Sequence, residues 1–392
     1  MNWFHSVCIA LASAAIASAA IASAAIASAA IASAAIAYAA PVAADNPEAS
    51  KLSEGLLQAR LDDLQAQQKD VPGFAIAVIK DGNAFSAATG IAAPDGTPMT
   101  ARTPFRLASV TKTFVAAAIL RLYEQGKLDL DTPIGDLVSE EHLRLLRADG
   151  YNVQAITVRH LLMHSSGLND HFGTAEMREM VFANPDRVWT RTQQLRLMTE
   201  MTERVGLPGE RFVYSDTGYL LLGEIIEKQT GTSLTDAVRA LNRFDKLGIG
   251  DLRWEGEQPQ SVLPDQAHQW LNGFDTFAIH GSVDAFGGGG LIGDVVATAT
   301  YFDALFGGSV FSKASTLRLM QVAPSQPAGS PYRIGLFEET VGDQKIYMHG
   351  GFWGVIALHV PAFDLTVVGV ALDQSGEPEI RQLAFDLIAV IE

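Results

Sequence analysis

Ser109 and Lys112 form the first combination of side chains in this sequence that could cleave an acyl bond. They stand three positions apart, in Ser-Val-Thr-Lys, where an extended stretch gives way to an apolar helical pattern. A hydroxyl at a helix start lies at the positive end of the helix dipole, and the side chain one turn on lies beside it. An amine held there can stabilise an alkoxide or relay its proton. The pair predicts a nucleophilic serine; the alternative is a helix-capping Ser followed by a solvated Lys.

Tyr214-Ser215-Asp216 is the second such combination. It follows Pro208-Gly209 and precedes a helical pattern, so we expect it in a loop. A buried tyrosine hydroxyl beside a lysine ammonium can have its pKa lowered and act as a general base. Tyr214 is therefore the candidate base, and the alternative is a core tyrosine next to a helix-capping aspartate.

His349-Gly350-Gly351 is the third combination, and it ends a predicted strand. Two glycines let another backbone, such as that of a substrate, approach a strand edge closely. The backbone N–H of Phe352 could then join that of Ser109 in donating to an oxyanion. The alternative is an ordinary Gly-Gly hairpin turn.

In order and context, the three motifs together resemble the serine β-lactamase and D,D-peptidase (penicillin-binding protein-like) superfamily, in particular its class C-like branch. The resemblance covers about residues 50–390 and includes the stretches 157–168, 214–223 and 288–291. It implies that Ser109 is the acylated nucleophile and that Lys112 and Tyr214 share proton transfer. It also implies an oxyanion hole made by the amides of Ser109 and Phe352. The substrate contacts that it implies are Asp216, His349, Gly350 and Gly351.

Two residues depart from the pattern of that family. Many members have Asn where Asp216 stands, and an ionised Asp can only accept hydrogen bonds. Asp216 would also keep Lys112 charged, which favours Tyr214 as the base. His349 stands where class C β-lactamases have a Lys that attracts the substrate carboxylate, and His is mostly neutral near pH 7. In this respect the motif is more similar to D,D-carboxypeptidases and D-aminopeptidases.

The motifs predict a serine hydrolase that acts through an acyl-enzyme on D-amino-acid-containing peptides or amides. It would resemble a D-alanyl-D-alanine carboxypeptidase or a D-aminopeptidase. A carboxylesterase or a weak β-lactamase of the same fold is the alternative. Asp216 leaves open a third possibility, a non-catalytic penicillin-fold protein that binds its ligand without turnover.

Other hydrolytic chemistries find less support in the sequence. His160 and His164 have a spacing of four residues, but no His-Glu-x-x-His motif occurs, so we expect no metal. No other cofactor is expected either. An α/β-hydrolase is disfavoured because Gly-x-Ser-x-Gly is absent from the chain.

The elements that must position these motifs are strands near both chain ends and helices between them. Strands are predicted at 74–80, 83–89, 332–338, 345–349, 355–360 and 365–371, with short turns that imply antiparallel pairing. The clearest helices are predicted at 52–68, 113–125, 158–163, 192–203, 218–229 and 380–391.

The fold class that follows is α/β (α+β). We expect an antiparallel sheet flanked by helices and built from both chain ends, with an inserted all-helical domain. The sheet domain is predicted to comprise residues 45–104 and 325–392. The helical domain, with the nucleophile and the tyrosine motif, is predicted to comprise residues 105–324.

Residues 1–44 differ from the rest of the chain in composition. They contain repeats of Ile-Ala-Ser-Ala-Ala and no Lys, Arg, Asp or Glu. A period of five residues gives no coherent helical face. We interpret them as a secretory signal peptide; an uncleaved membrane anchor through residues 6–40 and a low-complexity extension are the alternatives. An exported protein, periplasmic or secreted, is therefore expected, with membrane contact only if the leader is uncleaved.

The remainder carries all of the net charge of −16, from 28 Lys and Arg against 44 Asp and Glu. Such an acidic chain is a poor partner for nucleic acid. The single cysteine, Cys8, lies in the leader, so the body can form no internal disulfide. We expect a small-molecule or peptide substrate as the partner, and the sequence leaves the oligomeric state open.

Overall fold

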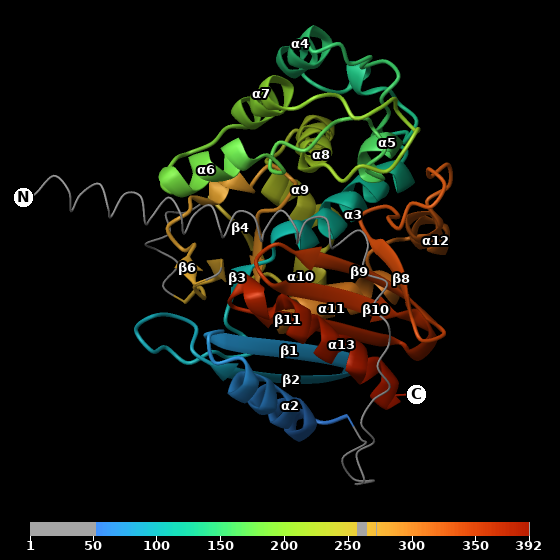
Figure 1. Cartoon of the computed structure of the whole chain (residues 1–392). Coiled ribbons are helices and arrows are strands. Elements are labelled where there is room, and N and C mark those ends of the chain that lie inside the picture. The colour runs from blue at the N-terminus through green and yellow to red at the C-terminus, as the bar shows by residue number, and fades with distance from the viewer. Residues whose placement is uncertain (1–51, 257–264, 272, 392) are drawn as a thin grey trace, which may run out of the picture.

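A six-stranded antiparallel sheet is the centre of the lower part of the molecule (Figure 1). The computed structural model describes residues 52–256, 265–271 and 273–391, so the predicted leader over residues 1–44 lies outside the described residues. The strand order is β2-β1-β11-β10-β9-β8. The strands are β1 (Gly73–Lys80), β2 (Asn83–Gly90), β8 (Phe337–Val341), β9 (Gln344–Gly351), β10 (Val355–Val360) and β11 (Leu365–Ala371).

The two chain ends meet in neighbouring strands of this sheet. β1 pairs with β11, and Phe74 lies opposite Ala371. The prediction of one antiparallel sheet built from both ends is therefore confirmed. One predicted strand, 332–338, is wrong: the strand begins at Phe337, because Gly335 has φ +71° and packs its backbone against Ala116.

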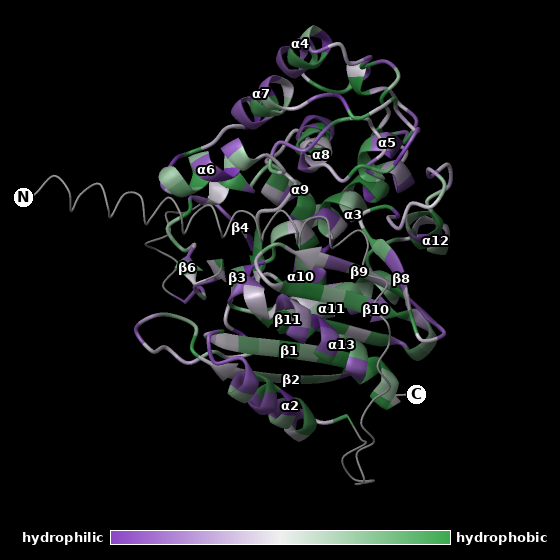
Figure 2. Ribbon diagram, viewed as in Figure 1, coloured by the Kyte–Doolittle hydropathy of each residue, from purple (hydrophilic) through white to green (hydrophobic). Residues whose placement is uncertain are grey.

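Both faces of the sheet are covered by helices, so its central strands are apolar on both sides. Alternate residues of β1 point to opposite faces. Phe74, Ile76 and Val78 belong to the core beneath α2 (Glu54–Gln67) and α13 (Glu377–Ile391). Ala75, Ala77 and Ile79 belong to the core shared with α11 (Val295–Phe306). Figure 2 shows hydrophobic residues along the strands and a hydrophilic side on α2.

Helices make up most of the region between the terminal strands. They are α3 (Thr111–Glu124), α4 (Glu140–Ala148), α5 (Val158–Leu162), α6 (Ala175–Ala183), α7 (Arg191–Met201), α8 (Asp216–Thr230), α9 (Leu234–Leu241), α10 (Phe244–Leu247) and α12 (Ala314–Val322). α3 is buried along most of its length, and it packs against α8 and α9. The starts of α3 and α8 carry two of the three sequence motifs.

The predicted all-helical region also contains short strands. β3 (Phe105–Arg106), β7 (Leu291–Gly293) and β4 (Arg253–Trp254) form a small sheet, and β5 (Trp270–Leu271) pairs with β6 (Phe274–Asp275). Strands of two or three residues are too short to show a hydrophobic period. α11 also falls within residues 105–324, yet it packs against β1, β10 and β11. The predicted boundaries between the two domains stay a prediction.

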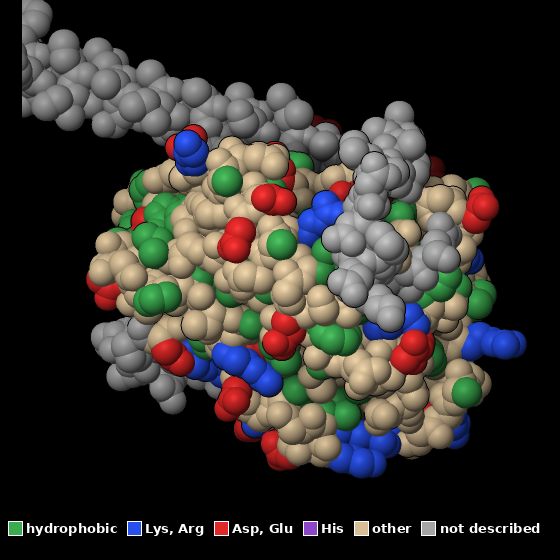
Figure 3. Space-filling view, turned by 90° about the horizontal axis from the view of Figure 1, so that it is seen from below, with side chains coloured by type: hydrophobic (Ala, Val, Ile, Leu, Met, Phe, Trp, Pro, Cys, Tyr) green, Lys and Arg blue, Asp and Glu red, His purple; other side chains and the backbone are tan. Residues whose placement is uncertain are grey.

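Charges of both signs are interspersed on the face seen from below in Figure 3. The excess acidic residues of the chain therefore do not form a single patch on this face. Within the described ranges, no helix has both the length and the hydropathy needed to cross a bilayer.

Candidate active site

Ser109 lies in a single 3-10 turn, Ala108–Val110, immediately before α3. Ala108 has φ +46°, in the left-handed region that non-glycine residues rarely adopt. Ala108 and Val110 are buried, whereas Ser109 is partly exposed. The strained turn thus brings the hydroxyl of Ser109 to the surface at the start of a buried helix, as the sequence predicts.

Lys112 lies one turn further along α3, and its side chain is 0% exposed. Its Nζ donates to Ser109 Oγ at 3.0 Å and to the carbonyl oxygen of Gly288 at 2.5 Å. It also forms an ion pair with Asp216 Oδ1. Tyr214 is a further hydrogen-bond partner of Lys112, so oxygens of four residues surround this ammonium.

The surroundings of Lys112 keep it protonated. Burial lowers the pKa of Lys112. The charge of Asp216, the nearby Tyr214 and a hydrogen bond to each of them outweigh burial and raise that pKa well above its ordinary value. The structure therefore favours Lys112 as a cation that stabilises negative charge on Ser109, and it disfavours Lys112 as a proton acceptor.

Tyr214 precedes α8, and its ring lies 4.9 Å from Lys112 Nζ. The sequence predicted that Lys112 would lower the pKa of Tyr214; Lys112 does act in that direction, but the net shift of this pKa is upward. Burial raises the pKa of Tyr214 to about 12, and the charge of Asp216 adds to this effect. Lys112 and a hydrogen bond with Ser109 oppose the shift without reversing it. Tyr214 is thus a neutral phenol near pH 7.

Two carboxyl groups that belong to none of the three sequence motifs lie close to Asp216. The N–H of Asp216 donates to Asp170 Oδ1 at 3.3 Å. Burial, followed by the charge of Asp216, raises the pKa of Asp170 to about 8 and that of Asp284 to about 6. Asp284 packs against Gly289, where any Cβ would lie 2.8 Å from its Cγ. The Gly-rich run after Asp284 was the only signal in the sequence for this contact.

His349 was expected to line the substrate site, but its side chain is buried and 1% exposed. Its Nδ1 donates to the carbonyl oxygen of Gly350 at 2.8 Å, and its Nε2 accepts from the hydroxyl of Tyr332 at 3.0 Å. Burial lowers the pKa of His349 to about 3. The imidazole is therefore neutral and fully engaged beneath the site, and it offers no charge to a substrate.

Gly351 and Gly350 differ in what they face. A Cβ on Gly351 would lie 2.4 Å from the carbonyl oxygen of Leu107, two residues before Ser109. Gly350 faces Arg381 of α13, at 3.4 Å from the position of a Cβ. Only Gly351 thus brings the end of β9 against the nucleophile turn. The oxyanion hole formed by the amides of Ser109 and Phe352 stays a prediction that this proximity supports.

Two aromatic rings lie beside the turn that carries Ser109. Phe172 and Phe352 are partly exposed and meet edge to face, with ring centroids 6.2 Å apart. Both pack against a cluster of buried apolar side chains that includes Ala108. The N–H of Phe172 donates to Asp170 Oδ1 at 3.1 Å, so apolar and acidic groups are adjacent here.

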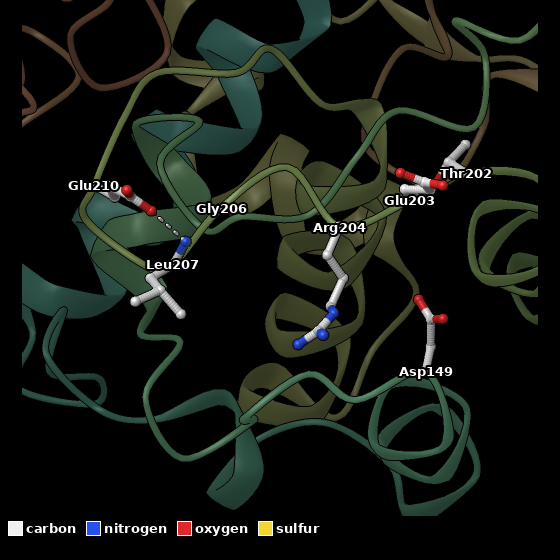
Figure 4. A pocket seen from close by; sticks show the side chains of 7 residues that line it. All are labelled: Asp149, Thr202, Glu203, Arg204, Gly206, Leu207 and Glu210. Atoms are coloured by element: carbon white, nitrogen blue, oxygen red, sulfur yellow. Dashed lines mark hydrogen bonds between the residues drawn. The ribbon is translucent and has the colours of Figure 1, made fainter.

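A surface pocket elsewhere contains none of the predicted site residues (Figure 4). It is lined by Asp149, Thr202, Glu203, Arg204, Gly206, Leu207 and Glu210. Its side chains are largely polar, and Glu210 accepts from the N–H of Leu207 at 2.8 Å. The three motifs converge at Ser109 and not at this pocket.

The described part of the chain has no group of three or more His, Cys, Asp or Glu side chains arranged to hold a metal ion. The spacing of His160 and His164 is not helical, since α5 ends at Leu162 and His164 has φ +52°.

Known proteins are similar to this chain in sequence and in fold. The sequence matches the Beta-lactamase family over residues 56–390. Esterase EstB from Burkholderia gladioli is 34% identical over 228 residues, which are 56% of this chain and 57% of the relative. D-aminopeptidase from Gluconobacter oxydans (strain 621H) is 26% identical over 322 residues, 76% of this chain and 55% of the relative. The chain spans about half the length of the curated relatives that it matches.

Solved structures agree with this relationship. The octameric penicillin-binding protein homologue from Pyrococcus abyssi has a TM-score of 0.69 and 25% identity, over 86% of this chain and 78% of that one. The Ser-x-x-Lys turn, the tyrosine loop and the His-Gly-Gly strand end meet at one site, on an antiparallel sheet made from both chain ends. With a family match over most of its length, the chain belongs to the Beta-lactamase family.

Proposed function

We propose that this protein is a serine hydrolase that forms an acyl-enzyme at Ser109 and acts on amides or short peptides of D-amino acids with a free amino group. The D-aminopeptidase among its relatives supports this substrate class. The contacts among Ser109, Lys112 and Tyr214 support the reaction.

Acylation can proceed with Lys112 charged and Tyr214 neutral. Ser109 Oγ attacks the substrate carbonyl while its proton passes to the Tyr214 oxygen, and Tyr214 gives its own proton to the leaving nitrogen. Tyr214 is neutral before and after the step, so its pKa of about 12 is no obstacle. Lys112 stabilises the charge that develops on Ser109. Water then releases the acyl group by the reverse proton path.

One observation carries the substrate class: the cations near the site are all paired with carboxylates. The positive charges that act on the buried groups here belong to Lys112, Arg106 and Arg381. Their ion-pair partners are Asp216, Glu255 and Glu377, respectively. A substrate carboxylate would therefore compete with existing pairs.

A substrate ammonium, in contrast, would find carboxyl groups that it could bind. Asp170 and Asp284 are held partly protonated near neutral pH by burial and by the charge of Asp216. A cation beside them would favour their ionised forms and gain two charged acceptors. This favours a D-aminopeptidase-like activity over a D-alanyl-D-alanine carboxypeptidase or a β-lactamase, whose substrates carry carboxylates.

The test compares three chromogenic substrates that share a leaving group. D-alanine p-nitroanilide should be cleaved with a kcat/KM about 10- to 100-fold above that of its N-acetyl derivative, because a hydrogen-bonded ammonium is lost. L-alanine p-nitroanilide tests the stereochemistry. Equal rates for the free and acetylated amines would contradict the proposed substrate class, while leaving Ser109 as the nucleophile.

A carboxylesterase is the second candidate, and the state of Lys112 and Tyr214 favours it. An alkoxide leaving group needs less protonation than an amine, so a neutral phenol beside a fixed cation suffices. The esterase relative supports the same reaction. Hydrolysis of p-nitrophenyl butyrate without any cleavage of D-alanine p-nitroanilide would decide for the esterase.

The leader over residues 1–44 supports a further part of the proposal, that the enzyme is exported. N-terminal sequencing of the protein from its native host would test this. A mature chain that begins near residue 45 agrees with export through a cleaved signal peptide. A chain that retains residue 1 and fractionates with the cytosol would contradict it.

A further inference from the structure

His164 has three contacts with the segment that carries Tyr214. Its carbonyl oxygen accepts from the N–H of Val213 at 2.8 Å. Its Nδ1 accepts from the N–H of Ser215 at 3.1 Å. Its imidazole ring lies on the ring of Tyr214, with centroids 4.2 Å apart and planes 34° apart. One residue therefore holds the backbone on both sides of Tyr214 and the ring itself.

The imidazole has one defined protonation state. Burial lowers the pKa of His164 well below its ordinary value, and the positive charge of Lys112 adds to this effect. Because Nδ1 accepts a hydrogen bond, the neutral ring carries its proton on Nε2. Only an acceptor at Nδ1 can bind the N–H of Ser215, so the tautomer and the contact require each other.

Nε2 has no hydrogen-bond partner among the described residues, and His164 is 1% exposed. Buried polar atoms are usually hydrogen-bonded, and an apolar ring would avoid this unpaired donor. Instead the ring packs among Tyr214, Tyr219 and Tyr332, with the last two centroids at 5.1 and 4.5 Å. These surroundings suit an apolar side chain, so the hydrogen bond that Nδ1 accepts from Ser215 is the feature that requires a histidine here.

The backbone of His164 is itself held in an unusual conformation. It follows the end of α5 with φ +52°. The next residue, Ser165, accepts from the N–H of Gly209 at 2.7 Å, which ties the approach to Tyr214 to the same loop. The geometry of the loop thus fixes where the imidazole can be.

We propose that His164 is a positioning residue that holds the Tyr214 hydroxyl at Ser109 and Lys112. Its ring sets the plane of the Tyr214 ring, and its Nδ1 and carbonyl oxygen fix the two flanking peptide groups. This inference rests on the proposed function of Tyr214 as a proton relay. It assigns His164 an effect on kcat and little effect on substrate binding.

Two substitutions separate the two side-chain contacts. His164→Asn keeps an acceptor near the position of Nδ1 and tolerates a positive φ, but it removes the ring. His164→Phe keeps a ring and removes the acceptor. Misplacement of a reacting group by about 1 Å can cost roughly 100-fold in rate. We expect kcat for p-nitrophenyl butyrate to fall roughly 10-fold in His164→Asn and roughly 100-fold in His164→Phe, with KM within about 2-fold of the wild type.

His359→Asn is the matched control. Like His164, His359 is buried and its Nδ1 forms a hydrogen bond, here with Thr366 Oγ1 at 2.9 Å. Its ring also stacks on an aromatic ring, that of Phe306, with centroids 4.2 Å apart. It lies in β10 and does not contact Tyr214. Its substitution should lower the melting temperature and leave kcat within about 2-fold, since no reacting group moves. A fall in kcat equal to that of His164→Asn would point to a general packing effect and overturn the proposal.

A double-mutant cycle with Tyr214→Phe gives the sharpest outcome. If His164 acts through the Tyr214 hydroxyl, His164→Asn should change the residual rate of Tyr214→Phe by less than about 2-fold. Full additivity of the two losses would overturn the inference. So would a His164→Phe enzyme with wild-type kcat. The same double-mutant cycle can be measured without a turnover substrate, with the rate at which a fluorophosphonate labels Ser109 in place of kcat. A wild type that is labelled yet hydrolyses no substrate would contradict the proposed function instead.

Discussion

Lys112 determines what the other residues around Ser109 can do. It is buried, it donates to Ser109 and Gly288, and it is paired with Asp216. A cation so placed stabilises negative charge on Ser109 and cannot take its proton. In the proposed mechanism the proton therefore travels through Tyr214, which is a neutral phenol near pH 7. Two substitutions test this account at the scale of single residues.

Tyr214→Phe removes the hydroxyl and keeps the ring. Loss of a group that relays a proton typically costs about 10²- to 10⁴-fold, and we expect acylation of Ser109 to slow by that amount. Stopped-flow release of p-nitrophenol measures the acylation rate directly. Acylation within a few-fold of the wild-type rate would mean that another group carries the proton.

Asp216→Asn removes the charge that holds the pKa of Lys112 high. Without that charge the pKa of Lys112 falls, because burial lowers it, so that Lys112 loses its proton at a lower pH than in the wild type. If the cation is the active form, the alkaline limb of the kcat–pH profile should move to lower pH. Asp245→Asn, at a carboxylate that is 92% exposed, is the control. An unmoved alkaline limb would show that Lys112 acts in another way.

The acidic groups predict a pH dependence of substrate binding. Burial holds the pKa of Asp170 at about 8 and that of Asp284 at about 6, so each becomes an anion only as the pH rises past its value. The KM for D-alanine p-nitroanilide should therefore fall between pH 5 and about 7.5, above which the substrate amine itself deprotonates. The N-acetyl substrate, which has no charge, should show a flat KM. A fall of the same size for both substrates would exclude an ammonium contact.

At the scale of elements, the site depends on the end of β9 meeting the turn before α3. The contact is close: a Cβ on Gly351 would lie 2.4 Å from the carbonyl oxygen of Leu107. The sequence indicated a close backbone approach at Gly350 and Gly351, but it did not show which of the two makes it. That information lies in the pleat of β9, which directs Gly350 toward α13 instead.

Gly351→Ala and its neighbour Gly350→Ala make a matched pair. Gly351→Ala must push β9 away from Leu107, because a backbone oxygen cannot move aside, so labelling of Ser109 should slow by at least about 10-fold. A Cβ on Gly350 would meet the flexible end of Arg381 at 3.4 Å and the carbonyl oxygen of Val355 at 3.8 Å, an ordinary van der Waals distance, so Gly350→Ala should label at close to the wild-type rate. Equal labelling rates in the two variants would show that the strand end does not shape the site.

At the scale of the whole molecule, the sequence predicted more of the fold than of the site. The antiparallel sheet from both chain ends could be predicted because its strands are apolar runs separated by short turns. The small sheet formed by β3, β7 and β4 could not, since strands so short leave no period.

The same difference holds for the residues around Ser109. Ser109, Lys112 and Tyr214 could be found because motifs with fixed spacing carry them. Asp170 and Asp284 lie in loops, and only the folded chain brings them to Asp216. The net shift of the Tyr214 pKa could not be predicted, because burial outweighs the nearby cation and burial is a property of the whole fold.

Every step of the proposed reaction depends on Ser109 as the nucleophile. Mass spectrometry of the chain after reaction with a fluorophosphonate, followed by peptide mapping, shows which side chain attacks an electrophile. We expect a single phosphonyl adduct on the peptide that contains Ser109, formed by the wild type and absent from a folded Ser109→Ala variant. An unmodified wild type, or an adduct that Ser109→Ala still forms, would contradict it.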